Sequence, residues 1–310
     1  MRIAFLGTPE FAIPSLQALL EDSRIRVEMV ITQPDRKRSR NRLTPTPVKK
    51  LAGEYNIPVF TPERLNSSDA VDRLIAQKPD FLVVIAYGQL IGKRLLEAFP
   101  DRIINIHGSL LPKYRGAAPI QRALLNGEPE TGLTAMLIEK EMDAGDMLAK
   151  KAVPISDEDD LDSLTDKLAN AAPDLLLDTL FSFSDRYEHR RSQDLSEVTY
   201  AAKIEKEDGV LSFDQTTKHL LNQVRTLKNW PGARFRYHGI EYKVHQAHGE
   251  EGLLRQKPGT VFRADARGIA IQAGDGAFVI DVIQAPGRRA ASCRDFLNGH
   301  DFPVGDQVEA

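Results

Sequence analysis

Two polar side chains, Asn105 and His107, stand two residues apart at the end of an apolar run. The run at Arg102–Ile104 predicts a strand that continues through His107, and side chains on a strand alternate between its two faces. The amide and the imidazole are therefore expected to point the same way. An amide can donate to a developing oxyanion, and an imidazole beside it can handle a proton, so this pair suits acyl transfer.

A carboxylate near His107 would complete such a site by orienting the imidazole. In a parallel α/β sheet, ligands bind beyond the carboxyl ends of the strands. The loop after the predicted strand Leu133–Ile138 is expected to lie at a second such end, and its sequence is EKEMDAGDML. Asp143 precedes Ala-Gly, which allows a tight turn, but spacing alone does not choose between it, Asp146 and Glu141.

The elements that must position these side chains follow an α/β order. A strand is predicted at Arg2–Gly7, followed by Thr8 as N-cap and Pro9 as first residue of a helix over Phe11–Leu20. The turn GTPEFA lacks the glycine spacing of a dinucleotide fingerprint, which argues against a nicotinamide or flavin site. Phe81–Ala86 is apolar throughout, like strands buried on both faces of a parallel sheet.

Further elements of this half follow from apolar periodicity. Three leucines from Leu161 onward have helical spacing, and Pro173 is expected to break or kink this helix before it continues over Leu175–Phe183. Ala152–Ile155 is expected to pair with Leu133–Ile138. The other predicted strands are Val27–Ile31, Pro58–Phe60 and Arg102–His107, and the other predicted helices are Val48–Tyr55, Ala70–Gln77 and Pro119–Leu125.

A basic segment runs from Arg36 to Lys50 and reads RKRSRNRLTPTPVKK. It holds seven Lys or Arg and no acidic residue, whereas the whole chain has a net charge of −3. Any affinity for nucleic acid would therefore have to come from a local patch such as this one. We expect an exposed, mobile loop, which is either a solvated run of charge or a loop that contacts phosphates.

The second half of the chain has a different pattern. Asp185 to Lys206 is polar without an apolar period and is interpreted as an interdomain connection. After one helix at Thr217–Leu227, short alternating strands separated by glycine-containing turns predict a small barrel. The predicted strands are Arg234–Tyr237, Tyr242–Ala247, Gly259–Phe262, Gly268–Gln272 and Ala277–Ile283.

The bulk composition excludes several classes of protein. Cys293 is the only cysteine, which excludes an intramolecular disulfide framework and a Cys-rich zinc site. The seven His are scattered, so no metal site is predicted. The N-terminus lacks the pattern of a signal or transit peptide, and no run approaches the ~20 apolar residues of a membrane span. We therefore expect a cytoplasmic protein, and 310 residues allow two domains.

The stretch from Asn105 to Leu148 resembles the signature of the folate-dependent formyltransferases. It reads NIHGSLLPKYRGAAPIQRALLNGEPETGLTAMLIEKEMDAGDML, and the Asn-x-His, SLLP and distant Asp together are specific to that family. The likeness continues nearly end to end, through FLGTPEFA, TQPDR, PTPVK, VVIAYG, NWPGARF, PGTVF, GDGAF and FLNG. It is greatest to the members of the family that act on a charged initiator tRNA.

This resemblance implies an α/β, Rossmann-like parallel-sheet formyltransferase domain at residues 1–185. A linker at 186–205 and a C-terminal OB-like, tRNA-binding β-barrel domain at 206–310 would follow. The implied activity moves a formyl group from the co-substrate 10-formyltetrahydrofolate, without a metal, to the α-amine of methionyl-initiator tRNA. The expected partners are that tRNA and the folate, and the expected state is a monomer without a membrane association.

The resemblance also implies roles for three groups of residues. The implied catalytic set is Asn105, His107 and Asp143. The implied folate-binding loop is Ser109, Leu110, Leu111 and Pro112, with Ala86, Tyr87 and Gly88 helping to line the pterin pocket. The implied tRNA contacts come from the basic segment, at Arg36, Lys37, Arg38, Arg40 and Arg42.

The basic segment departs from the family pattern, in which a Pro and Gly-Arg-Gly separate the PDR from the PxPVK. Here it reads KRSRNRLT. Arg40 lies nearest to the loop arginine of the family, and Arg38 and Arg42 are alternatives.

Two other functions remain open from the sequence. The same catalytic residues could formylate a small amine, such as a sugar nucleotide or glycinamide ribotide. A non-catalytic RNA-binding protein is the rival from another class. From Lys206 onward the chain holds 14 Lys or Arg and 13 Asp or Glu, which is a weak charge excess for a stand-alone RNA binder.

Overall fold

The computed structural model describes residues 1–37, 43–250 and 256–309. The chain divides into two compact units. Unit 1 comprises residues 1–120, 130–154 and 163–201, and unit 2 comprises residues 121–129, 155–162 and 202–310. The predicted domain boundaries at 185 and 206 stay predictions.

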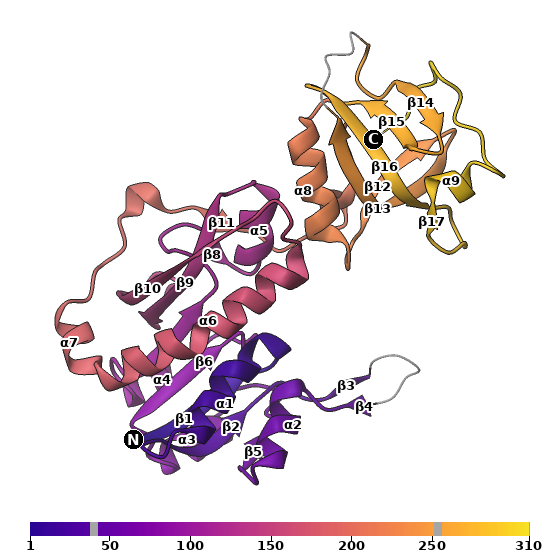
Figure 1. Cartoon of the computed structure of the whole chain (residues 1–310). Coiled ribbons are helices and arrows are strands. Elements are labelled where there is room, and N and C mark those ends of the chain that lie inside the picture. Colours follow the sequence, from indigo (N-terminus) through magenta and orange to yellow (C-terminus); the bar gives the residue numbers. More distant parts are fainter. Residues whose placement is uncertain (38–42, 251–255, 310) are drawn as a thin grey trace. The chain divides into compact units, whose positions relative to one another are not determined.

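One seven-stranded sheet forms the centre of unit 1 (Figure 1). Its strands are β1 (Arg2–Gly7), β2 (Arg26–Ile31), β5 (Val59–Phe60), β6 (Phe81–Ile85), β7 (Ile103–His107), β9 (Glu130–Leu137) and β10 (Met147–Pro154). The strand order is β10-β9-β7-β6-β1-β2-β5, and the five strands from β7 to β5 pair in parallel. The α/β class with a parallel-rich sheet is therefore confirmed.

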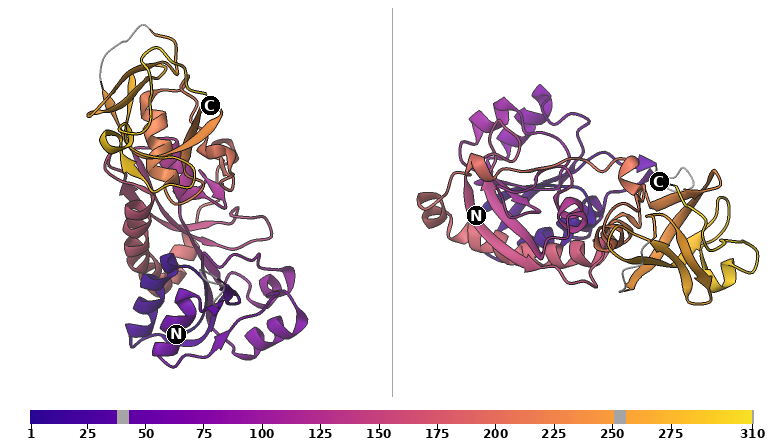
Figure 2. Two further views of the ribbon diagram at one scale, coloured as in Figure 1. Left: turned by 90° about the vertical axis from the view of Figure 1, so that its right-hand side faces the viewer. Right: turned by 90° about the horizontal axis from the view of Figure 1, so that it is seen from above.

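Helices cover both faces of this sheet (Figure 2). They are α1 (Ile13–Glu21), α2 (Pro47–Glu54), α3 (Ser68–Ala76), α4 (Lys93–Ala98), α6 (Leu161–Phe181) and α7 (Phe183–Glu188). On one face, Leu6 of β1 and Leu82 of β6 form a core with Val71 of α3 and Leu95 of α4. On the other face, where α1 and α6 lie, Phe5 is fully buried. Burial on both faces explains why these strands read as continuous apolar runs.

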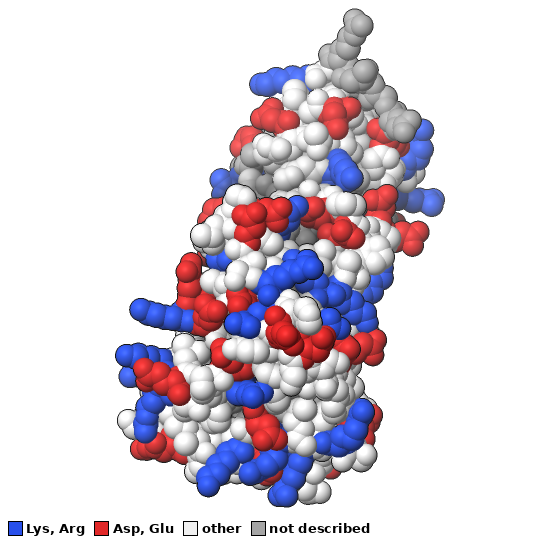
Figure 3. Space-filling model, turned by 90° about the vertical axis from the view of Figure 1, so that its left-hand side faces the viewer, with Lys and Arg blue, Asp and Glu red and all other residues white. Residues whose placement is uncertain are grey.

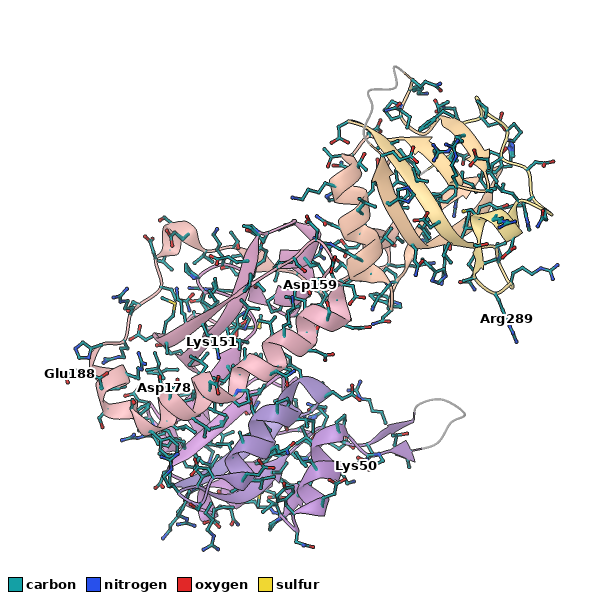
Figure 4. All side chains as sticks on the ribbon, viewed as in Figure 1. Lys50, Lys151, Asp159, Asp178, Glu188 and Arg289 are labelled. Carbon is teal, nitrogen blue, oxygen red and sulfur yellow. The ribbon has the colours of Figure 1, made fainter. Side chains whose placement is uncertain are left out.

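β10 forms the edge of the sheet beside α6. Lys151 of β10, labelled in Figure 4, forms an ion pair with Asp174 of α6, with 2.8 Å between Nζ and Oδ2. The helix runs unbroken through Pro173, so the first of the two expected effects, a break, is wrong, while a kink there stays a prediction. Its buried positions before and after the proline, such as Leu168 and Leu176, keep packing as one apolar stripe. That packing offsets the backbone hydrogen bond that a proline cannot make.

The direction of β9 differs from expectation. It pairs antiparallel with β7, so that His107 lies opposite Thr134 and Ile104 lies opposite Leu137. The loop after β9 therefore begins at the amino end of β7, where the N–H of Ile138 donates to the carbonyl of Ile103 at 2.9 Å. The expectation that it shares an edge with the carboxyl end of β7 is wrong.

Smaller differences concern element ends. β10 does pair with β9 as predicted, but it begins at Met147. Thr8 is not an N-cap, because its hydroxyl donates to the carbonyl of Tyr87 at 2.9 Å and a 3-10 turn, η1 (Glu10–Ala12), precedes α1. The short helix α4 has no counterpart in the prediction.

The polar segment interpreted as a connection contributes to unit 1 up to Ala201. It contains a 3-10 turn, η3 (Leu195–Glu197), and a two-residue strand, β11 (Tyr200–Ala201). β11 pairs in parallel with β8 (Arg115–Gly116), directly after the loop that follows β7. This pairing is long-range, and a segment without an apolar period carries no sign of it.

Unit 2 contains a six-stranded antiparallel sheet. Its strands are β12 (Ala233–Tyr237), β13 (Ile240–Glu250), β14 (Val261–Asp265), β15 (Gly268–Gln272), β16 (Ala277–Gln284) and β17 (Ala291–Ser292), and its helices include α8 (Thr217–Leu227) and α9 (Cys293–Phe296). The C-terminal segment bridges both ends of the strand order, since Glu309 pairs with Arg236 and Gln307 pairs with Thr260. These bridges close the sheet around an aromatic core that includes Phe278. The predicted small barrel is thus confirmed.

None of the helices in residues 1–37, 43–250 and 256–309 combines the length and the apolar character needed to cross a bilayer.

Candidate active site

Asn105 and His107 occupy one face of β7, as the strand period predicts, and they differ in exposure. The side chain of His107 is buried, while Asn105 is half-buried. Within the part of the chain that the structure describes, no hydrogen bond engages the Asn105 side chain. An amide in this position keeps both of its N–H donors available to a ligand.

The imidazole of His107 makes a hydrogen bond and lies next to a carboxylate. Its Nε2 lies 2.9 Å from the carbonyl oxygen of Tyr114. Because a carbonyl can only accept, Nε2 carries the proton and donates. Nδ1 then faces Oδ1 of Asp143 at 3.7 Å, which is too long for a direct hydrogen bond. Contacts of this kind are often long in a site without its substrate and tighten when the substrate binds.

The structure brings Asp143, and not its competitors, next to His107. The carboxylate of Asp146 accepts from Arg190 Nε at 3.0 Å and from Ser192 Oγ at 2.6 Å. Glu141 is largely exposed, with 74% of its side chain accessible. Although the loop starts at the far end of β7, it folds back so that Asp143 reaches the carboxyl end of that strand.

The loop Ser109–Pro112 is held mainly by buried contacts. The Ser109 hydroxyl is fully buried and donates to the carbonyl of Lys113 at 2.6 Å. Leu111 packs with Met136 and Met147 in a small apolar cluster, and Pro112 is buried. Of the four side chains in the loop, only that of Leu110 is half-buried rather than buried. A ligand at this loop would therefore meet main-chain groups and Leu110, rather than the Ser109 hydroxyl.

Two residues outside the predicted set fasten this loop. Thr134 of β9 is fully buried, and its Oγ1 donates to the carbonyl of Ser109 at 2.7 Å and accepts from the N–H of Leu111 at 3.1 Å. Lys150 of β10 donates to the carbonyl of Leu111. Burial lowers the pKa of the Lys150 ammonium. Neither residue carries a local signal, because both contacts depend on the pairing of β7, β9 and β10.

The turn after β6 presents backbone rather than the tyrosine ring. Ala86 and Gly88 are exposed and have φ angles of 47° and 88°. Tyr87 is only 1% exposed and packs in the core under the sheet. Its hydroxyl has no hydrogen-bond partner among the described residues, and burial raises its pKa to about 12. Tyr87 therefore supports this turn from within the core, and its ring is not exposed to a ligand.

The ends of the basic segment form a hairpin of β3 (Arg36–Lys37) and β4 (Leu43–Thr44), which extends from the body of unit 1 (Figure 1). Arg36 is exposed on β3. Arg38, Arg40 and Arg42 lie outside the described residues.

Two contacts hold the base of this hairpin. Thr32 and Thr46 share a buried hydroxyl hydrogen bond of 2.8 Å, and Lys49 Nζ pairs with Asp35 Oδ2 at 2.6 Å. This ion pair joins Lys49 of α2 to the residue directly before β3. On the face of the protein shown in Figure 3, by contrast, Lys and Arg side chains lie among Asp and Glu.

The sequence also offered no prediction of a buried polar pair, Arg115 and Gln193, that contacts the Asp143 loop. Arg115 is 2% exposed and Gln193 is 8% exposed. Gln193 Nε2 donates to the carbonyls of Asp143 and Gly145, and its Oε1 accepts from Arg115 Nε. Gln193 belongs to the segment interpreted as a connection, where nothing in the local sequence marks a buried position. Among the described residues, no group of three His, Cys, Asp or Glu is placed to hold a metal ion.

Comparison with known families gives two matches that together cover most of the chain. Residues 1–180 match the formyl transferase family, and residues 203–301 match the family of formyl transferase C-terminal domains.

Similar proteins agree with these matches. The chain is 40% identical over 312 residues to the methionyl-tRNA formyltransferase of Sulfurihydrogenibium sp. (strain YO3AOP1), covering 100% of both chains. It is 43% identical over 310 residues to the enzyme of the same name from Latilactobacillus sakei subsp. sakei (strain 23K), covering 99% of this chain and 97% of that one. Among solved structures, WlaRD, a sugar 3N-formyl transferase crystallised in the presence of dTDP and 5-N-formyl-THF, superposes with a TM-score of 0.67. That likeness covers 93% of this chain and 99% of WlaRD at 19% identity, so it concerns the fold alone.

Proposed function

The chain belongs to the formyl transferase family, among the methionyl-tRNA formyltransferases, and from this premise we propose that it formylates methionyl-initiator tRNA with 10-formyltetrahydrofolate. The observation that carries the proposal is the convergence of Asn105, His107 and Asp143 at the end of β7. The α-amine of the aminoacyl group attacks the formyl carbon, the bond from that carbon to the folate nitrogen breaks, and a proton passes from the amine to that nitrogen. An α-amine has a pKa of about 7.7–8.0, and the neighbouring ester lowers it, so a free-base nucleophile exists near neutral pH.

Each of the three side chains has a distinct part in this proposal. Asn105 donates to the formyl oxygen as negative charge develops on it, which its unengaged amide allows. His107 lies on the same face of β7 as Asn105, so its imidazole is placed beside the formyl carbon that the amine attacks. Asp143 faces His107 Nδ1 at 3.7 Å, and this pair of side chains is proposed to receive a proton from the attacking amine and pass it on.

The folate is proposed to lie against the loop Ser109–Pro112 and the turn Ala86–Gly88. The exposed backbone of the turn and the half-buried Leu110 offer the mixture of apolar surface and fixed main-chain groups that flat ligands bind. Because the loop is fastened by Thr134 and Lys150, these groups are held in place before the folate arrives.

The tRNA is proposed to contact the basic hairpin of unit 1 and the barrel of unit 2, with the protein acting as a cytoplasmic monomer. Arg36, Lys37, Arg38, Arg40 and Arg42 provide five cations within seven residues. Such a cluster suits backbone phosphates, which dominate affinity for nucleic acids.

A formyl-transfer assay tests this function. The purified protein is given 10-formyltetrahydrofolate and, in separate reactions, methionyl-initiator tRNA, methionyl-elongator tRNA and a sugar-nucleotide amine. We expect rapid formylation of the initiator tRNA only. Equal rates with the sugar amine would favour the small-amine alternative, and RNA binding without any formyl transfer would favour the non-catalytic one.

A further inference from the structure

Gln193 holds the backbone of the loop that carries Asp143. Its Nε2 donates to the carbonyl oxygen of Asp143 at 2.8 Å and to that of Gly145 at 2.9 Å. These two bonds use both N–H groups of the amide, so the side chain is fully engaged as a donor. The contact is formed across 50 residues of sequence and is buried, so solvent hardly competes with it.

Arg115 fixes Gln193 in turn. Arg115 Nε donates to Gln193 Oε1 at 2.9 Å, which decides which end of the amide faces the loop. Arg115 is 2% exposed, and its Nη2 has no partner among the described residues. The nearest carboxylate to it is that of Glu141, at 3.9 Å from Nη1, on the same loop as Asp143. A buried cation with so little charge compensation is costly for stability, and such a cost points to a functional reason for keeping it.

The side chain of Asp143 is held by the residue that follows Arg115. The N–H of Gly116 donates to Asp143 Oδ2 at 2.8 Å, which leaves Oδ1 toward His107. Asp143 itself has a φ of 55°, in the left-handed region that a non-glycine residue rarely adopts. A residue in this conformation needs its surroundings to hold it, and Gln193 provides hydrogen bonds at Asp143 itself and two residues later.

We propose that Gln193, oriented by Arg115, is a positioning residue for Asp143. It acts by holding the backbone of the Asp143 loop and touches no reacting atom. This inference rests on the proposed function of Asp143, and it adds two residues from β8 and from the segment after α7 to the machinery of formyl transfer.

The test begins with Gln193→Met, which keeps the length of the side chain and removes both donors. Because displacement of a catalytic group by about 1 Å can cost up to about 10²-fold, we expect kcat to fall by about 10- to 10²-fold. We expect KM for the folate and for the tRNA to change by less than about threefold, since Gln193 contacts neither proposed binding loop. A purely structural loss would lower the amount of active enzyme and the melting temperature without this separation of kcat from KM.

Gln223→Met is the matched control. Gln223 is 7% exposed, and its Nε2 also donates to two backbone carbonyls, those of Asp208 and Val210, but in unit 2. This variant loses the same kind of bonds at a distance in sequence from the site. It is expected to lose stability without a fall in kcat, and an equal fall in kcat in both variants would overturn the proposal.

A double variant separates action through Asp143 from any other effect. If Gln193 acts only by placing Asp143, then Gln193→Met should change the single-turnover rate by less than about threefold when Asp143 is already Asn. A full additional loss in the double variant would overturn the proposal. Gln193→Glu covers the case in which Gln193→Met does not fold, because the carboxylate keeps its contact with Arg115 and still cannot donate to the loop. Wild-type kcat in the folded Gln193→Glu protein would also overturn it.

The outcome distinguishes this inference from the proposed function. If the wild-type protein transfers no formyl group, the function itself fails before any variant is compared. If the wild type is active and Gln193→Met has the same kcat, the function stands and the positioning role of Gln193 falls.

Discussion

The amide of Asn105 is set apart from most polar groups around it by having no hydrogen bond to the described protein. Most buried polar groups in unit 1 are engaged, as His107 and Ser109 are. An N–H donor without a protein partner costs little folding free energy in a half-buried position, because water can reach it, and it stays available to bind a ligand. The first prediction tests whether this available donor contributes to catalysis.

Asn105→Ala should lower kcat by about 10²–10³, which is the usual cost of losing one oxyanion donor. The melting temperature should hardly change, because the side chain makes no hydrogen bond that the fold depends on. Steady-state kinetics and a thermal melt measure the two quantities. A folded Asn105→Ala protein with the wild-type rate would remove Asn105 from the mechanism.

Tyr87 offers a second prediction at the residue scale, and it concerns stability. Its buried hydroxyl is unpartnered among the described residues, so Tyr87→Phe should raise the free energy of unfolding at neutral pH by about 1 kcal/mol. Burial raises the pKa of the phenol from 10.0 to about 12. Between these two values the unfolded chain loses the proton and the folded protein keeps it, so stability present below pH 10 is lost as the pH rises toward 12. The variant should lose less stability than the wild type over that range in urea titrations.

Tyr237→Phe is the contrasting control for this prediction. The Tyr237 hydroxyl donates to Asp306 Oδ2 at 2.6 Å. Its removal should lower the free energy of unfolding at neutral pH by about 1.5–3 kcal/mol, since a charge-assisted hydrogen bond is lost. If both phenylalanine variants changed stability in the same direction, the account given for Tyr87 would be wrong.

At the scale of elements, the antiparallel direction of β9 links β7 to the loop Ser109–Pro112. It places Thr134 opposite His107, and the hydroxyl of Thr134 then spans Ser109 and Leu111. In a parallel arrangement the same residue would lie elsewhere in the register. The loop is consequently positioned by a neighbouring strand more than by its own sequence.

Thr134→Val tests this dependence. The substitution keeps the branched shape but leaves the carbonyl of Ser109 and the N–H of Leu111 without their partner, at a cost of about 1–3 kcal/mol for each orphaned group. We expect a lower melting temperature and a higher KM for the folate, with KM for the tRNA unchanged. Calorimetry and steady-state kinetics provide both readouts.

Thr226→Val in α8 serves as the control for that variant. Thr226 is equally buried, but its hydroxyl has no partner among the described residues. Its loss should therefore cost no stability and leave the folate KM at its wild-type value. A raised folate KM in this variant as well would show that the effect does not arise at the Ser109–Pro112 loop.

At the scale of the whole molecule, the net charge is slightly negative, while one segment of the sequence is strongly basic. The net charge of −3 gives no overall attraction to a nucleic acid, and the basic hairpin is the place where cations gather without acids. Its base is fixed by the Asp35–Lys49 pair, and Arg36 is exposed on β3.

Replacing Arg38, Arg40 and Arg42 together by Ala should raise KM for the tRNA and leave KM for the folate unchanged. The dependence of tRNA binding on salt should also weaken, because fewer counterions are released when fewer phosphates are contacted. Binding measured across a series of salt concentrations gives this slope. A control with the same change in charge is Arg64, Arg73 and Lys93 to Ala, at exposed positions in unit 1. An unchanged slope and KM in the hairpin variant would leave the segment as a solvated run of charge.

Much of this protein is determined by patterns that act locally along the chain. The period of a strand places Asn105 and His107 on one face whatever surrounds them. Continuous apolar runs require strands buried on both faces, and the alternating strands from Arg234 onward require a barrel-like sheet. The resemblance to a family singles out Asp143 as the expected partner of His107, where spacing alone left Asp146 and Glu141 open.

Only the tertiary structure decided what depends on contacts between distant segments. The direction of β9, the fold-back of the Asp143 loop and the inward hydroxyl of Ser109 are set by strand pairing and burial, which no local period records. Gln193 reaches the loop across 50 residues from a segment that looks like a solvated connection. Its role follows from where the chain returns in space, because a hydrogen bond depends on the distance between two groups and not on their separation in sequence.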